Sequence, residues 1–175
     1  MKLISHPTLR TEESLLKQCQ FTQTRRSGPG GQHRNKTATA VVFEHLPSGI
    51  RGEAGERRSQ ADNRRVALRR LRENLAVMLR SVPTSETNNE ESVRADEIWN
   101  RYRQSGFSIH PTNPDFPPLL ALVLDDLFAA QGRIRETAEL WGASTSQLLR
   151  FLKLHKAAWG TVQQWRKEAG LSALH

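Results

Sequence analysis

The chain has 175 residues, 37% of them hydrophobic and 25% charged, and its 26 Lys and Arg exceed its 18 Asp and Glu by enough to give a net charge of +8. This length suits one ordinary domain or two small ones. The sequence contains no apolar run long enough for a membrane span and no apolar N-terminal segment typical of a secretory signal. A single cysteine, Cys19, excludes an internal disulfide and a cysteine zinc cage. We therefore expect a protein of the cytoplasm or an organelle matrix, with no bound metal.

The basic excess lies entirely in the first half of the chain. Residues 1–82 contain 16 Lys and Arg against 7 Asp and Glu, whereas residues 83–175 contain 10 against 11. Such an imbalance favours a polyanionic partner, most often nucleic acid. Arginine predominates over lysine there, and its planar fork matches a phosphate better. The alternative interpretation is a surface that only keeps the protein soluble.

Residues 1–82 are predicted to form a small α+β domain, a three-stranded sheet with one long helix packed on it. Its predicted elements are a short helix over 11–16, strands over 18–25 and 39–43, a turn at 46–49, a third strand from 50 and a helix over 59–80. In the first strand, Cys19 and Phe21 are expected to face inward. The long helix carries its apolar stripe on Leu68, Leu71, Leu75 and Met78.

The second half is predicted to be helical, after an acidic polar linker over 83–92. We expect helices over 93–104, 119–130, 134–140, 144–154 and around 159–167, with 110–118 irregular because of its four prolines. Ala138, Gly142, Leu148 and Phe151 have the spacing of a helix-turn-helix core, and Ser144 or Thr145 would cap its second helix. An ordinary three-helix packing motif would explain the same spacing.

The most informative segment is the glycine-rich stretch that follows the first predicted strand. Gly30 and Gly31 permit backbone conformations closed to other residues and let a main-chain N–H approach a ligand closely. The amide of Gln32 can donate and accept hydrogen bonds but cannot act as a base at neutral pH. Such a loop could catalyse by positioning and by electrostatic stabilisation, with water as the nucleophile.

Several motifs in order carry a resemblance to a known family. They are Arg26-Ser-Gly-Pro-Gly-Gly-Gln-His-Arg-Asn-Lys36, Thr39-Ala40, His45-Leu-Pro-Ser-Gly-Ile50 and Glu56-Arg-Arg-Ser-Gln60, followed by an arginine-rich helix. Over roughly residues 12–80 the chain resembles the catalytic domain of class I peptide chain release factors. It is also similar to their shorter, codon-independent relatives that rescue stalled ribosomes. In this family the loop enters the peptidyl transferase centre and promotes hydrolysis of the peptidyl-tRNA ester.

The resemblance implies a role for each matching residue. Gln32 would sit beside the ester, stabilise charge with its backbone N–H and help to position water, with Gly30 and Gly31 supplying the backbone geometry. Gln32 would also be the site of side-chain methylation by a glutamine methyltransferase. Contacts to 23S-type rRNA or tRNA would come from Arg25, Arg26, His33, Arg34, Lys36, Arg57 and Arg58. No cofactor is implied, and we expect a monomer.

The second half departs from the pattern of the family. The codon-independent relatives commonly end in a basic tail, whereas residues 165–175 contain only two basic residues. About 25 residues precede the loop, so direct reading of a stop codon is not expected. We expect residues 93–175 to act as the recruiting element, with or without a helper protein. Two alternatives remain at this stage: a catalytically silent rRNA-binding or ribosome-assembly factor, and a DNA-binding regulator that uses the helical half.

Overall fold

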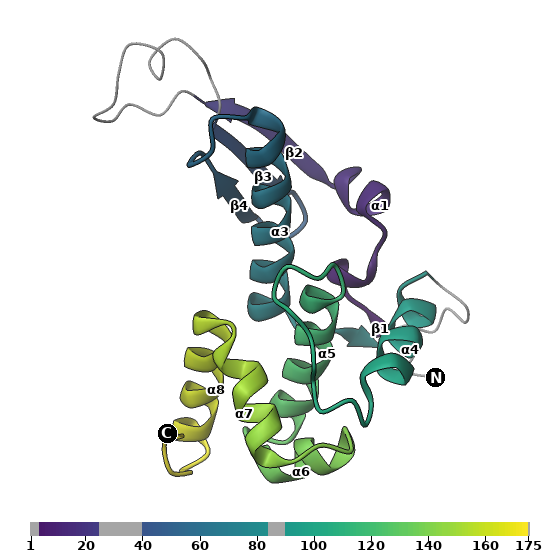
Figure 1. Cartoon of the computed structure of the whole chain (residues 1–175), viewed down its shortest axis with the longest axis vertical. Coiled ribbons are helices and arrows are strands. Elements are labelled where there is room, and N and C mark those ends of the chain that lie inside the picture. Colours follow the sequence, from purple (N-terminus) through teal and green to yellow (C-terminus); the bar gives the residue numbers. More distant parts are fainter. Residues whose placement is uncertain (1–3, 25–39, 84–89, 175) are drawn as a thin grey trace. The chain divides into compact units, whose positions relative to one another are not determined.

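The computed structural model describes residues 4–24, 40–83 and 90–174. The chain divides into two compact units, Arg10–Leu75 and Met1–Leu9 with Ala76–His175. The predicted α+β class is confirmed, since a three-stranded antiparallel sheet and a long helix are followed by several further helices (Figure 1). Among the described residues, no helix is both long and apolar enough to cross a membrane.

The unit Arg10–Leu75 contains the sheet and most of the long helix. Its elements are α1 (Glu12–Leu16), β2 (Cys19–Thr24), β3 (Ala40–His45), β4 (Ile50–Ala54) and α3 (Gln60–Met78), and the strand order is β2-β3-β4. The side chain of Thr11 caps α1 by accepting a hydrogen bond from the Ser14 N–H. Gly49, with φ of 68°, completes the turn between β3 and β4 in the left-handed conformation that glycine adopts without strain.

The helix and the sheet are in contact through the alternate residues of the strands. Ile50, Gly52 and Ala54 are buried on β4, between exposed neighbours, as the period of two in a strand requires. At Gly52 the two backbones come so close that a Cβ would lie 2.3 Å from the Ala67 carbonyl oxygen. The absence of a side chain at this residue therefore sets how closely α3 approaches β4.

One predicted core position in this unit is wrong, and another is only partly covered. The stripe on α3 is confirmed for Leu68, Leu71 and Leu75, but Met78, at the last residue of the helix, is 67% exposed. Phe21 does face the same side of the sheet as its buried register partner Phe43, but it is 38% exposed because β2 is an edge strand and only one neighbouring strand borders it. Cys19 is half-buried, and its Sγ donates to the Leu15 carbonyl oxygen.

The other unit joins the N-terminal segment to the C-terminal helices. Its elements are β1 (Ile4–Ser5), the 3-10 helix η1 (Pro7–Leu9), β5 (Val82–Pro83), α4 (Glu90–Tyr102), α5 (Phe116–Ala129), α6 (Ile134–Leu140), α7 (Thr145–Lys153) and α8 (Lys156–Glu168). β1 pairs with β5 in an antiparallel ladder. Leu9 is buried in the same core as the apolar residues of α5, so the N-terminal segment is part of this unit.

Three helices of this unit, α4, α5 and α8, begin earlier than the sequence predicts, whereas α6 begins at the predicted residue. α5 begins at Phe116 because Pro117 and Pro118 occupy its first turn, where no backbone N–H is needed. α4 begins at Glu90, so the last three residues of the predicted linker are helical, while residues 84–89 lie outside the described part of the chain. α6 and α7 are joined by a turn at Gly142, with φ of 61°, and Ser144 forms a capping box with Gln147.

Candidate nucleic-acid interface

Most of the predicted site residues lie outside the described residues. These are Arg25, Arg26, Gly30, Gly31, Gln32, His33, Arg34 and Lys36. The structure does place the two ends of the segment that carries them. Thr24, the last residue of β2, is the register partner of Ala40, the first residue of β3. The glycine-rich segment is therefore the connection of an antiparallel hairpin, and both of its ends lie at the same end of the sheet.

The two described site residues, Arg57 and Arg58, lie near that same end. Val41 pairs with Ala54, so β4 ends beside the start of β3, and the chain passes through Arg57 and Arg58 before α3 begins. Both side chains are exposed, and neither has an ion pair or hydrogen bond within the described part of the chain. Two unpaired guanidinium groups at this end of the sheet can each bind a phosphate.

A buried asparagine fixes the backbone that presents these arginines. Asn63 is fully buried, and its Oδ1 accepts from the Arg57 N–H at 2.9 Å while its Nδ2 donates to the Arg57 carbonyl oxygen at 2.9 Å. Ser59 caps the helix that carries Asn63 by accepting from the Asp62 N–H. This role of Asn63 is not evident from the sequence, because an asparagine in the first turn of a helix has no pattern that distinguishes it.

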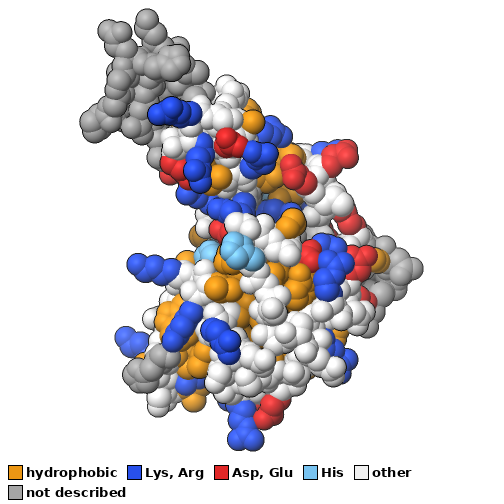
Figure 2. Space-filling view, in the orientation of Figure 1, with side chains coloured by type: hydrophobic (Ala, Val, Ile, Leu, Met, Phe, Trp, Pro, Cys, Tyr) orange, Lys and Arg blue, Asp and Glu red, His pale blue; other side chains and the backbone are white. Residues whose placement is uncertain are grey.

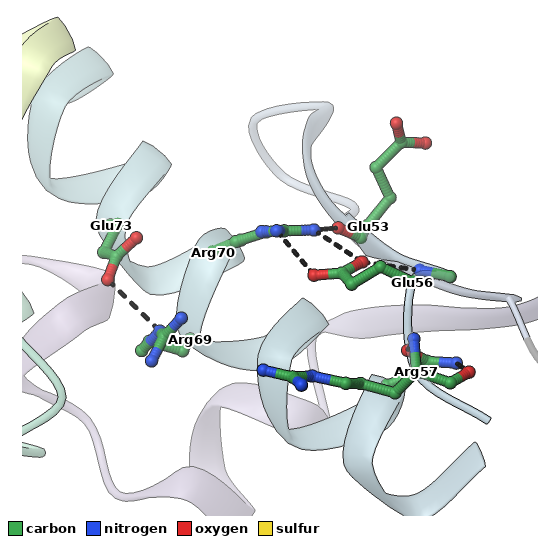
Figure 3. Close-up of polar contacts among 8 residues, drawn as sticks. Glu53, Glu56, Arg57, Arg69, Arg70 and Glu73 are labelled. Carbon is green, nitrogen blue, oxygen red and sulfur yellow. Dashed lines mark hydrogen bonds and ion pairs between the residues drawn. The ribbon is translucent and has the colours of Figure 1, made fainter. Parts of the chain in front are cut away.

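Arg70 on α3 has a structural role (Figure 3). The Nη2 of Arg70 donates to Glu56 Oε1 at 2.7 Å, and its Nη1 donates to the Glu53 carbonyl oxygen at 2.8 Å. The pKa of Glu56 is lowered to about 2, chiefly because its carboxylate accepts a hydrogen bond from the Gly55 N–H, with Arg70 adding to the effect. Arg70 thus ties the segment after β4 to the helix and is already neutralised.

Two other arginines on α3 also have acidic partners. Arg65 pairs with Asp62. Arg69 pairs with Glu73 at 3.5 Å, and Figure 3 shows this second pair. The pKa of Glu73 is raised because burial of its carboxyl group outweighs the nearby guanidinium groups. Three arginines of the helix are therefore neutralised by acidic partners, whereas Arg57 and Arg58 have no ion pair within the described residues.

Arg64 makes a different contact, with aromatic rings of the sheet. Its guanidinium carbon lies 5.4 Å from the ring centroid of Phe21 and 5.3 Å from that of Phe43. The two rings are themselves 5.2 Å apart. This cation–π arrangement partly covers the exposed ring on the edge strand.

The sequence model of the RF-1 domain matches residues 13–108, which is more than half of the chain. The chain belongs to the RF-1 domain family. The resemblance to the catalytic domain of class I release factors is confirmed. The matched segment of this RF-1 domain protein includes the hairpin, α3 and α4.

Individual relatives agree with the family match. The chain is 41% identical over 70 residues to the mitochondrial peptide chain release factor 1-like protein of Mus musculus, covering 40% of this chain and 19% of the relative. It is 39% identical over 87 residues to peptide chain release factor 2 of Treponema pallidum, covering 50% of this chain and 23% of the relative. It is 43% identical over 74 residues to peptide chain release factor 1 of Symbiobacterium thermophilum, covering 42% of this chain and 20% of the relative. The chain thus spans about a fifth of the length of these relatives.

Proposed function

We propose that this RF-1 domain protein hydrolyses the peptidyl-tRNA ester in the peptidyl transferase centre without reading a codon, and so releases nascent chains from stalled ribosomes or large subunits. One observation carries the proposal: in a chain of this family, the Gly-Gly-Gln segment connects the register partners Thr24 and Ala40. The hairpin gives this segment a rigid base, as a loop that must position a reacting group requires.

The proposed chemistry uses water as the nucleophile. Its oxygen attacks the ester carbonyl carbon, the bond from that carbon to the ribose oxygen breaks, and a proton is transferred to the ribose oxygen. The backbone N–H of Gln32 stabilises the charge that develops, while its side chain positions the water. Gly30 and Gly31 supply the backbone conformation, and no residue of the loop serves as a general base. Gln32 is also the proposed site of amide methylation by a glutamine methyltransferase.

The proposed contacts to the ribosome are mainly to phosphate. Arg57 and Arg58, exposed and unpaired in the described part of the chain, bind the 23S-type rRNA or tRNA backbone on the side of the sheet where the loop begins. The other proposed RNA contacts are Arg25, Arg26, His33, Arg34 and Lys36. The proposed place of action is the cytoplasm or an organelle matrix, where ribosomes work.

The test is release of labelled peptide from peptidyl-tRNA on purified ribosomes with no stop codon in the A site. Large subunits alone serve as a second substrate. The wild-type chain is compared with Gln32→Ala and with a matched control, Gln23→Ala, at an exposed residue of β2. We expect release by the wild type and by the control, and a loss of at least 100-fold in Gln32→Ala.

Two results would contradict the proposal. Equal release by Gln32→Ala and the wild type would exclude Gln32 from the reaction. Tight ribosome binding without release on either substrate would indicate an RNA-binding protein that lacks the chemistry. Comparison of the two substrates also identifies which stalled state is used.

A further inference from the structure

The charge of the helical half is divided between its helices. Residues 83–140 contain 5 Lys and Arg against 10 Asp and Glu, whereas residues 141–175 contain 5 against 1. The near-neutral total of this half therefore combines an acidic part, α4 to α6, with a basic part, α7 and α8. In Figure 2, Lys and Arg side chains stand out from the part of the surface that α7 and α8 occupy in Figure 1.

Most of the basic side chains of α7 and α8 are directed to solvent. Arg150, Lys156 and Lys167 are exposed and have no ion pair within the described residues. Lys153 lies with its Nζ 5.1 Å from the ring centroid of Trp159, which links the end of α7 to α8. Arg166 is the exception, since its guanidinium donates to the carbonyl oxygens of Gly132 and Ser172 and so has a structural role.

The outward stripe of α8 has a glycine at its centre. Lys156, Gly160, Gln164 and Lys167 recur at intervals of four, four and three residues, which places them on one face of the helix, and all four are exposed. A Cβ at Gly160 would have no atom within 4 Å, so nothing inside the protein requires a glycine there. Glycine in the middle of an exposed helix is less stable than alanine. A surface that another molecule must approach closely explains this residue.

We propose that this stripe of α8, together with Arg150 and Lys153 at the end of α7, binds the sugar-phosphate backbone of RNA. Lysine and arginine neutralise phosphates, and Gly160 lets the backbone lie close to the helix. The Nε2 of Gln164 donates to Glu168 Oε1 at 2.8 Å, so the phosphate contacts come from the cationic side chains. The stripe carries no large apolar side chain, which a protein interface would need as an anchor. The choice of RNA over DNA rests on the proposed function at the ribosome.

The charge test uses the full-length chain and purified large-subunit rRNA as the probe. The double variant Lys156→Glu, Lys167→Glu is compared with the double variant Lys17→Glu, Arg135→Glu. The control makes the same change in net charge at two exposed residues outside the stripe. We expect the α8 variant to bind at least tenfold more weakly than the control. We also expect its plot of log affinity against log salt to be shallower by about 2, or 0.9 for each lost phosphate contact.

The glycine test separates binding from stability. Gly160→Ala should raise the midpoint of thermal unfolding by about 2–4 °C, since alanine is the better helix former. Gly160→Leu should keep at least wild-type stability but bind the rRNA about tenfold more weakly, because its side chain holds the backbone away. Ala129→Leu, at an exposed residue of α5, is the control and should bind normally. Wild-type affinity in Gly160→Leu would contradict the close approach.

Further probes distinguish other partners. A DNA duplex and polyglutamate are tested with the same variants. Loss of affinity for either of these, with rRNA binding unchanged, would overturn the proposal and indicate DNA or an acidic protein. Peptide release is measured separately. If the wild type releases peptide but the α8 variants bind rRNA as tightly as their controls, only this inference is overturned. If the wild type releases no peptide but the α8 variants bind rRNA more weakly than their controls, only the proposed hydrolysis is overturned.

Discussion

Gly52 on β4 and Leu71 on α3 are in contact backbone to backbone, such that a Cβ at Gly52 would lie 2.2 Å from the Leu71 nitrogen. Neither backbone can shift without breaking hydrogen bonds, because Leu71 belongs to a helix and Gly52 to a strand that pairs with β3. The residue opposite Gly52 in the sheet is Phe43, a fully buried ring of this unit. The contact therefore determines whether α3 can cover the sheet that carries the proposed catalytic loop.

Gly52→Ala is expected to destabilise the sheet unit by about 3 kcal/mol, because the methyl group forces α3 away from β4. Hydrogen exchange of the β3 and β4 amides measures this effect locally. Gly49→Ala is the control, since a Cβ there meets no atom within 4 Å and only the φ of 68° opposes it. That variant should cost about 1 kcal/mol. Equal costs at the two residues would show that the backbone contact is unimportant.

Asn63→Ala is expected to cost about 2 kcal/mol in stability, because the N–H and carbonyl of Arg57 lose their buried partner. It should also lower peptide release, since the backbone that presents Arg57 and Arg58 is no longer fixed. The control is Asn74→Ala, which removes one hydrogen bond from the same helix to the Arg51 carbonyl oxygen. Thermal unfolding and single-turnover release measure the two effects. Release as high in Asn63→Ala as in the control would exclude the positioning role.

Replacing Arg57 and Arg58 together with alanine is expected to weaken ribosome binding and to make the salt dependence shallower by about 2, while leaving the stability nearly unchanged. Arg51→Ala is the matched control, because Arg51 is on the same sheet but pairs with Glu44 at 2.7 Å. Binding titrations at several salt concentrations give both quantities. If the arginines are only solvated surface charges, the double variant will show the same salt slope as the wild type.

The stability of the helical unit is expected to fall as the pH drops below about 6.5. His155 caps α8 by accepting from the Ala158 N–H through Nδ1, and burial lowers its pKa from the ordinary 6.5. Between the folded and unfolded pKa values the unfolded chain binds more protons, so the free energy of unfolding decreases with decreasing pH. All four tryptophans belong to this unit, so their fluorescence reports its unfolding.

His155→Asn keeps a capping side chain but does not titrate, so it should remove part of this pH dependence. His110→Asn, at an exposed histidine, is the control and should leave the wild-type profile unchanged. Identical profiles for His155→Asn and the wild type would show that the cap is not sensitive to protonation. His45 also has a pKa lowered by burial, but it belongs to the other unit and is not reported by tryptophan fluorescence.

The sequence predicts the long elements of the fold because their patterns repeat over several turns or pairs. Leu68, Leu71 and Leu75 repeat at helical spacing, and all three are buried on α3. The ladder of Ile4–Ser5 with Val82–Pro83 was not predicted, since two residues show no periodicity. Met78 continues the stripe of α3 in sequence but is the last residue of the helix and is 67% exposed.

The residues of the candidate site are predicted from the run of motifs shared with a known family and not from hydrophobic periodicity. Arg57 and Arg58 were found because they stand in a recognised run of residues, whereas Asn63 became visible only through its two hydrogen bonds to Arg57. The sequence does not predict a role for Gly160 either, because a glycine in a helix can be interpreted only when the space around it is known. The basic character of α7 and α8 was hidden by averaging the charge over the whole second half.

The pairing of β1 with β5 gives the protein the topology of an insertion. The chain starts one unit with its first nine residues, completes the sheet unit over 10–75, and then returns to the first unit. During synthesis from the N-terminus, the inserted sheet unit can therefore fold before α4 to α8 of the other unit, the host, have been made. Removing the first nine residues, which contain the buried Leu9, would take away part of the host's core and not a dispensable tail.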